Sequence, residues 1–131
     1  MRFLVDTSVW IDHFKKKDDE LVMLLTEDSV VLNWDIIGEL QSGNLNNRSL
    51  VLEFLCALPR ITAYNDFEIY RFIELHKIYG KGLSWIDLKI IHSAVMNHLE
   101  VLSRDKRLLS TFRGLQRLNL AVSMQDKNEV D

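Results

Sequence analysis

The sequence contains one cysteine, one proline and five glycines among 131 residues, and these scarcities exclude several classes of protein. Cys56 has no second cysteine to pair with, so an intrachain disulfide is impossible and a zinc cluster is disfavoured. The single proline, Pro59, falls between two apolar segments, and the chain has no Pro/Gly/Ser-rich linker, low-complexity tract or repeat. We therefore expect residues 1–131 to form one domain with a substantial core.

Long apolar runs are also absent. The opening run from Phe3 to Val5 is short and ends at Asp6, which predicts neither a signal peptide nor a membrane span. Hydrophobic residues make up 47% of the chain and charged residues 27%, as in ordinary globular proteins. With its lone cysteine, the chain suits the reducing cytoplasm.

The histidines show no metal-binding pattern. His13, His76, His92 and His98 form neither an HxxxH nor an HxH spacing, which disfavours both a zinc site and histidine-driven hydrolysis. His92 follows Asp87 by five positions, about 140° around a helix, so we expect its side chain to point away from that of Asp87.

Short strand-like runs alternate with longer stretches of helical period. This pattern predicts an α/β fold, a doubly wound parallel sheet of about five strands with helices on both faces. The predicted strands are residues 2–5, 30–32, 61–64, 100–103 and, more weakly, 117–121. The predicted helices are residues 8–14, 19–26, 35–41, 49–58, 66–79 and 84–98, with Asp35 as the N-cap of the third.

Four acidic residues are placed to meet at one edge of such a sheet. Asp6 and Asp105 directly follow the first and fourth predicted strands, whereas Glu39 and Asp87 lie on helices that reach the same edge. Like charges at about 4 Å repel by roughly 4 kcal/mol at an effective dielectric of 20, so the cluster needs a cation. Oxygen ligands select Mg²⁺ or Mn²⁺, which can activate water and neutralise charge on a phosphodiester.

At these residues the chain resembles the PIN-domain nucleases. The segments that carry the resemblance, in the family's order, are Val5-Asp6-Thr7-Ser8-Val9-Trp10-Ile11, Ile37-Gly38-Glu39-Leu40, the run from Gly82 to Ala94 around Asp87, and Ser103-Arg104-Asp105-Lys106-Arg107-Leu108-Leu109. They span about the first 110 residues, and the four together are far more specific than any one alone. Ile91 and His92 depart from the small residues that the family commonly has after the third motif's aspartate, whereas Ser103 preserves the hydroxyl of the usual threonine.

The size and the last two motifs are most similar to those of the VapC-type toxins. That resemblance implies a Mg²⁺- or Mn²⁺-dependent endoribonuclease, usually a homodimer, inhibited by a cognate antitoxin protein. It implies Asp6 and Asp87 as central metal ligands, with Glu39 and Asp105 completing the site directly or through water. Members of this group cut structured RNA such as tRNA or an rRNA loop, and nothing in the sequence discriminates among these targets.

Each acid also has a structural interpretation. Asp6 can cap the helix that follows it, Asp87 can interact with a helix dipole, Glu39 can be an exposed helix residue, and Asp105 can belong to a polar turn. Asp35 shares a helical face with Glu39, but capping explains it better than metal binding.

Several neighbouring residues are weaker candidates for the site. Thr7 and Ser8 could present hydroxyls to a metal-bound water or a phosphate, while Arg104, Lys106 and Arg107 could bind RNA phosphates. Charge clusters are more often solvated surface. Net charge is −3, but without four metal-binding acids the remaining surface would be nearly neutral, which is compatible with RNA. Base stacking by Trp10, Trp34 or Trp85 is possible in principle, and packing in the core or a dimer interface is the favoured interpretation.

Two other functions are weighed against the nuclease. A phosphoacceptor receiver needs an acid at the end of the third strand, where Tyr64-Asn65 stands, and an aspartate-nucleophile phosphatase needs a second aspartate at Ser8. The other alternative is a catalytically inactive PIN-fold binding module. Four intact acids argue against it, since their mutual repulsion is unfavourable without a cation.

Overall fold

The computed structural model describes the backbone of residues 1–129 and the side chains of residues 1–118. Within them, three parallel strands, β1 (Phe3–Val5), β2 (Val30–Val31) and β3 (Glu100–Leu102), form a sheet in the order β2-β1-β3. Leu4 of β1 is paired with Val31 on one side and Val101 on the other. The helices are α1 (Thr7–Lys15), α2 (Asp19–Thr26), α3 (Trp34–Ser42), α4 (Arg48–Ala57), α5 (Asp66–His76), α6 (Trp85–Met96) and α7 (Lys106–Glu129).

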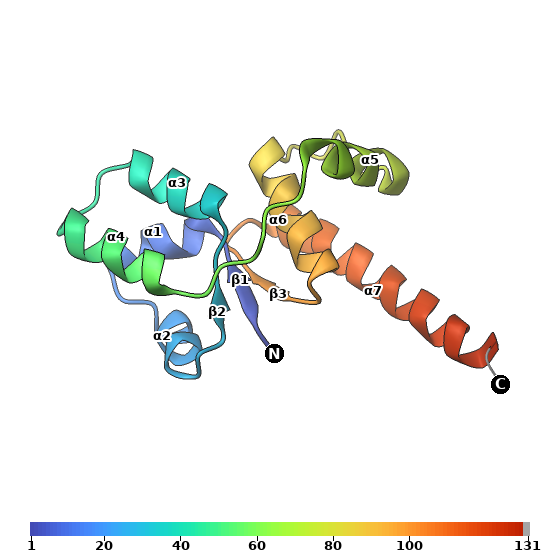
Figure 1. Ribbon diagram of the computed structural model, residues 1–131, viewed down its shortest axis with the longest axis horizontal. Helices are drawn as coiled ribbons and strands as arrows, with labels where there is room; N and C mark the ends of the chain where they lie inside the picture. Colours follow the sequence, from blue (N-terminus) through green and yellow to red (C-terminus); the bar gives the residue numbers. More distant parts are fainter. Residues whose placement is uncertain (130–131) are drawn as a thin grey trace.

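Helices cover both sides of the strands. In Figure 1, α1 to α4 lie on one side of the sheet and α5 to α7 on the other, with the far end of α7 running away from the body. The strands are apolar and buried, and Leu4, Val5 and Val31 belong to one core cluster with Ile90 and Ile91 of α6. The parallel α/β architecture is therefore as predicted, because buried β-branched and leucine-rich strands favour parallel pairing under helices.

The predicted third strand, residues 61–64, is wrong. The chain makes one parallel bridge there, between Leu32 and Arg60, and then leaves the sheet. Tyr64 packs its ring edge-on against His92 of α6, and its hydroxyl accepts a hydrogen bond from Asn97 at 3.2 Å. The apolar residues of this segment are thus partly buried against a helix rather than paired as a strand, a distinction that an apolar run alone does not make.

The predicted fifth strand, residues 117–121, is also wrong, and α7 was not predicted. Leu108, Phe112 and Leu115 recur at helical spacing and are buried in the core, and the helix continues past them without a proline to stop it. Among the described residues the sheet therefore has three strands instead of five.

The other helices match the prediction to within a few residues. The N-cap of α3 is Asn33, whose side chain accepts from the Ile36 amide at 2.8 Å, and Asp35 instead lies in the first helical turn. Helix α5 ends at His76, before the predicted residue 79, because Lys77 adopts a left-handed conformation. No helix in the described part of the chain is both long enough and apolar enough to cross a membrane.

Candidate active site

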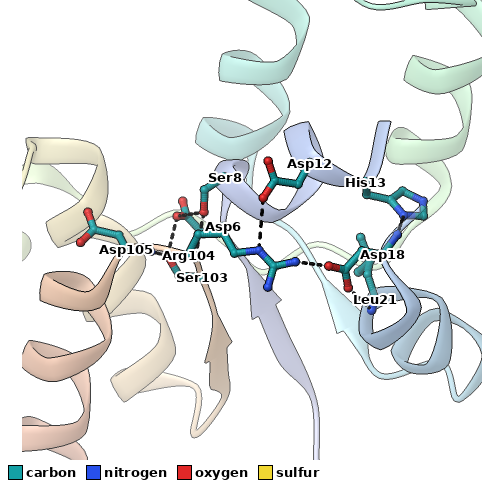
Figure 2. A network of polar contacts seen from close by, with 9 residues as sticks. All are labelled: Asp6, Ser8, Asp12, His13, Asp18, Leu21, Ser103, Arg104 and Asp105. Atoms are coloured by element: carbon teal, nitrogen blue, oxygen red, sulfur yellow. Dashed lines mark hydrogen bonds and ion pairs between the residues drawn. The ribbon is translucent and has the colours of Figure 1, made fainter. Parts of the chain in front are cut away.

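Asp6 lies at the carboxyl end of β1, the strand beside which the strand order reverses. The Asp6 residue is 6% exposed, and its carboxylate accepts three hydrogen bonds. Oδ1 accepts from the Thr7 amide at 2.8 Å. Oδ2 accepts from the hydroxyls of Ser8 at 2.9 Å and Ser103 at 2.7 Å, as Figure 2 shows. Asp6 also caps α1, so the structural interpretation and a ligand role can coexist.

Ser103 links Asp6 to the segment that carries Asp105. While donating to Asp6, its hydroxyl oxygen accepts from the Asp105 amide at 3.0 Å. Oδ1 of Asp105 then accepts from the amides of Arg107 at 2.9 Å and Leu108 at 3.2 Å, and so begins α7. Register along the sheet makes this possible, since Val5 and Leu102 are paired and the two strands end together.

Glu39 reaches the same edge from α3. Its Oε1 accepts a hydrogen bond from the Thr7 hydroxyl at 2.9 Å, which connects it to the residue that follows Asp6. The pKa of Glu39 is raised, first by desolvation and then by the negative charges of Asp6, Asp87 and Asp35, against the opposing effect of the Thr7 hydrogen bond. Glu39 therefore interacts electrostatically with two other members of the predicted site.

Asp87 lies in the first turn of α6 and forms a capping box with Ser84. Its Oδ2 accepts from the Ser84 amide at 3.0 Å, and the Ser84 hydroxyl accepts from the Asp87 amide at 3.1 Å. This reciprocal pair fixes the carboxylate at the start of the helix, where the dipole favours a negative charge.

The four acids (Asp6, Glu39, Asp87 and Asp105) have no cationic side chain as partner among the described residues. The ion pairs found there involve Asp35, Asp12 and Asp18 instead. As the side chains stand, no three Asp, Glu, His or Cys residues in that part of the chain lie together in a group that could hold a metal ion. Mg²⁺ keeps several waters and needs one or two carboxylates plus substrate phosphate, so this open, all-oxygen donor set fits such an ion. The metal site itself stays a prediction.

Arg104 is directed away from the four acids. Its guanidinium pairs with Asp12 of α1 and with Asp18, the N-cap of α2, as Figure 2 shows. Its backbone N–H donates to the Ser8 hydroxyl oxygen at 3.1 Å. The Leu21 amide, and secondarily Arg104, lower the pKa of Asp18. Because two carboxylates neutralise Arg104, the arrangement favours a role in joining α1, α2 and the β3–α7 connection over RNA binding.

Lys106 and Arg107 are exposed at the start of α7, and neither forms an ion pair with any described residue. Arg107 lies over Gly82 in the loop before α6, so closely that a Cβ at Gly82 would come within 2.4 Å of its Nη1. Of the three predicted phosphate ligands, these two remain available to an anion.

The three tryptophans have different environments. Trp10 is fully buried, and its Nε1 donates to the Val5 carbonyl oxygen at 3.2 Å, so it is a core residue as predicted. Trp34 is 58% exposed and Trp85 is 42% exposed. Trp34 also lines a hollow beside Glu39, which core packing does not explain.

Some residues around the site could not be predicted from the sequence because their partners lie far away along the chain. Asp12 and Asp18 bind Arg104 across about 90 positions of sequence, and neither was a candidate. Ser103 was noted for its hydroxyl but not as the bridge between two acids. The one signal available was position: Ser103 follows a strand directly, as Asp6 does.

Comparison with known proteins gives a consistent family assignment. The PIN-domain family model matches residues 3–113. The chain is 35% identical over 106 residues to "Ribonuclease VapC32" of two Mycobacterium tuberculosis strains, CDC 1551 / Oshkosh and ATCC 25618 / H37Rv, covering 80% of this chain and 86% of each relative. A shorter match, 37% over 62 residues, is to "tRNA sulfurtransferase" of Histophilus somni; it covers 13% of that protein and supports no argument here.

Proposed function

This chain belongs to the PIN-domain family and is of the VapC type. We propose that it is a Mg²⁺- or Mn²⁺-dependent endoribonuclease, the toxin of a type II toxin-antitoxin pair. The observation that carries the proposal is that Asp6, Glu39, Asp87 and Asp105 have no cationic partner among the described residues. All four lie within the family match, and Ser103 links two of them by hydrogen bonding to both Asp6 and Asp105. An uncompensated acidic edge is unfavourable for the protein alone and suits a bound divalent cation.

Each acid has a role that its contacts support. Asp6 is the most rigidly held and would be a central ligand together with Asp87, while Glu39 and Asp105 complete the site directly or through water. A bound ion supplies activation of the attacking water and neutralises charge on the phosphate. Ser8 and Ser103 orient Asp6, and Thr7 orients Glu39, so these hydroxyls position the ligands.

The proposal extends to partners and context. Residues 1–131 would act as one nuclease domain, in the cytoplasm, on an RNA that could be a tRNA or an rRNA. A cognate antitoxin would inhibit it, and two copies would form a homodimer. Lys106 and Arg107 are the proposed phosphate contacts on this chain, since neither is paired with another described side chain.

The main alternative is an inactive module that retains the fold and binds a partner without cutting RNA. Desolvation first, and then the charges of Asp6 and Asp87, raise the pKa of Glu39, so the charged form of Glu39 is disfavoured in the protein alone. A bound cation would offset that cost, which favours the enzyme. The phosphatase alternative fits poorly, since its second aspartate would stand at Ser8, which here donates to Asp6.

A brief expression experiment tests the proposal. Wild type and Asp6→Ala are induced in cells and new RNA 5′ ends are mapped, with Asp19→Ala, an exposed α2 acid outside the site, as the matched control. We expect the same new ends with wild type and Asp19→Ala and none with Asp6→Ala. Ends that persist in Asp6→Ala, or are missing in wild type, would refute the nuclease assignment.

A further inference from the structure

A hollow of about 510 Å³ lies between α3 and the start of α6, and Glu39 is the one member of the four acids that lines it. It is lined by one face of α3, namely Trp34, Asp35, Gly38, Glu39 and Ser42, and by Ile86 of α6. The hollow is open to solvent, so a ligand in it would be covered on one side only. Glu39 is shared by the hollow and the proposed metal site, so whatever occupies the hollow lies beside the phosphate that is cut.

The walls of the hollow are held in place. Lys89 of α6 forms an ion pair with Asp35 of α3 at 3.0 Å, which joins the two helices and neutralises the Asp35 carboxylate. The Arg60 guanidinium lies 4.8 Å from the Trp34 ring centroid, a cation–π contact that restrains the indole. Trp34 thus presents a preorganised aromatic surface, more than half of it open to solvent.

Gly38 lines the hollow without a side chain of its own. A Cβ at this position would meet no atom within 4 Å, so the space above Gly38 is open. The remaining polar groups are suited to a neutral ligand with hydrogen-bond donors. Glu39 and Asp35 offer acceptor oxygens, while the Ser42 hydroxyl donates to the Gly38 carbonyl at 2.8 Å and keeps its own oxygen as an acceptor.

We propose that this hollow holds one unpaired nucleobase of the RNA, stacked on Trp34, next to the scissile phosphate. The inference rests on the proposed ribonuclease function and narrows the substrate to RNA with a base splayed out of any helix. The Glu39 carboxylate, which has no cationic partner among the described residues, disfavours a phosphate in the hollow. A flat, uncharged base with amino or imino donors fits both the aromatic wall and the acceptor rim.

The test measures binding and cleavage by variants of the hollow. Affinity is measured for a short fluorescein-labelled single-stranded RNA of mixed sequence and for a fully paired duplex of the same composition, with Mg²⁺ present and in an Asp6→Ala background to prevent cutting. The variants are Trp34→Ala, Trp34→Phe and Gly38→Leu. Phe67→Ala, which truncates an exposed aromatic residue of α5, is the matched control. Thermal melting verifies that each variant folds, and light scattering reports its oligomeric state.

We expect Trp34→Ala to weaken single-strand binding by about five-fold to about 150-fold, the range for loss of one base–aromatic stack. Gly38→Leu, which fills the hollow, should weaken single-strand binding as well. Trp34→Phe should recover part of the affinity that Trp34→Ala loses, because a smaller aromatic ring remains, and Phe67→Ala should bind as the parent does. None should alter duplex binding. With Asp6 restored, Trp34→Ala should raise KM for the single strand more than it lowers kcat.

Several results would overturn the inference. One is that Trp34→Ala and Gly38→Leu bind the single-stranded RNA as tightly as the parent does. Another is that these variants lose as much affinity for the duplex as for the single strand. A change of oligomeric state in both variants would assign the hollow to contact with a second copy. These outcomes leave the nuclease proposal intact if the otherwise wild-type protein still cuts RNA. A wild-type protein that neither binds nor cuts RNA refutes both.

Discussion

At the residue scale, Glu39 carries the clearest sign of electrostatic strain. Desolvation first, and then nearby carboxylates, raise its folded-state pKa above 4.5, so the folded protein binds this proton more tightly than the unfolded chain does. The associated stability is fully present below about pH 4.5 and is lost as pH rises through the raised value. Glu39→Gln should therefore raise the melting temperature of the metal-free protein at pH 7.5, by roughly 1–3 °C for such an exposed group.

The higher melting temperature of Glu39→Gln should disappear under two conditions. Near pH 4 the two proteins should melt together, since Glu39 is then largely protonated, and excess Mn²⁺ should stabilise wild type more than the variant. Differential scanning fluorimetry across pH and Mn²⁺ concentration measures both effects. A glutamine variant less stable than wild type at pH 7.5 without metal would contradict the assignment of strain to Glu39.

His92 predicts a separate dependence on pH. The residue is 3% exposed and its imidazole packs between Tyr64 and Phe72, and its Nδ1 has no hydrogen-bond partner among the described residues. Burial lowers the pKa of His92 below 6.5, and the charge of Glu68 opposes that shift. As pH falls below 6.5, His92 is protonated in the unfolded chain before it is protonated in the folded protein. The free energy of unfolding should therefore fall by up to about 1.4 kcal/mol per pH unit.

Urea unfolding of wild type and His92→Leu between pH 7.5 and 5 checks this prediction. The difference in unfolding free energy between the two proteins should change with pH in favour of the leucine variant as the solution becomes more acidic. Parallel pH profiles would show that His92 does not remain neutral in the fold.

Residue positions in the sequence predicted the acidic edge but not the contacts around it. Asp6 and Asp105 directly follow strands, and the ends of parallel strands must meet, so their neighbourhood could be anticipated. From its sequence neighbours alone, Arg104 is a weak candidate for RNA binding or a solvated surface residue. Its true partners, Asp12 and Asp18, come from the α1–α2 region, and that pairing is set by tertiary packing.

At the scale of the elements, the loop before α6 is expected to position both Asp87 and Arg107. Gly82 has φ +74°, a conformation that costs a residue with a Cβ about 1–2 kcal/mol, and an added Cβ would also displace the Arg107 guanidinium. Gly80 has φ +71° but a Cβ there would meet nothing within 4 Å, which makes Gly80→Ala a matched control.

Both alanine variants should therefore lose similar stability by urea unfolding, while Gly82→Ala should lose more RNA cleavage than Gly80→Ala at a temperature where both are folded. Equal activities in the two variants would mean that the position of Arg107 over Gly82 has no bearing on the reaction.

Elements were predictable where their signals were local. Helices α1 to α6 have apolar periodicity, all but α4 have a capping side chain, and their predicted bounds lie within a few residues of those observed. The errors at residues 61–64 and 117–121 concern segments whose type depends on what they pack against: α6 for the first, and continuation of a long helix for the second. Short apolar segments do not carry that information themselves.

At the scale of the whole molecule, the fold explains why residues scattered between positions 6 and 105 can act together. The strand order β2-β1-β3 places Asp6 centrally, Ser103 and Asp105 follow the neighbouring strand, and α3 and α6 bring Glu39 and Asp87 to the same edge. The family was recognisable from four ordered motifs. The first and fourth stand at the ends of β1 and β3, the third contains the start of α6, and the second lies within α3.

Isothermal titration of Mn²⁺ into the metal-free protein tests the central claim, a divalent-cation site formed by the four acids. Wild type and Asp12→Asn, an α1 acid outside the site, should bind Mn²⁺ with similar affinity, whereas Asp6→Asn and Asp87→Asn should bind it at least about tenfold more weakly, the loss of roughly 1.4 kcal/mol or more. Binding of equal strength by all four proteins, or no binding by wild type, would contradict the account.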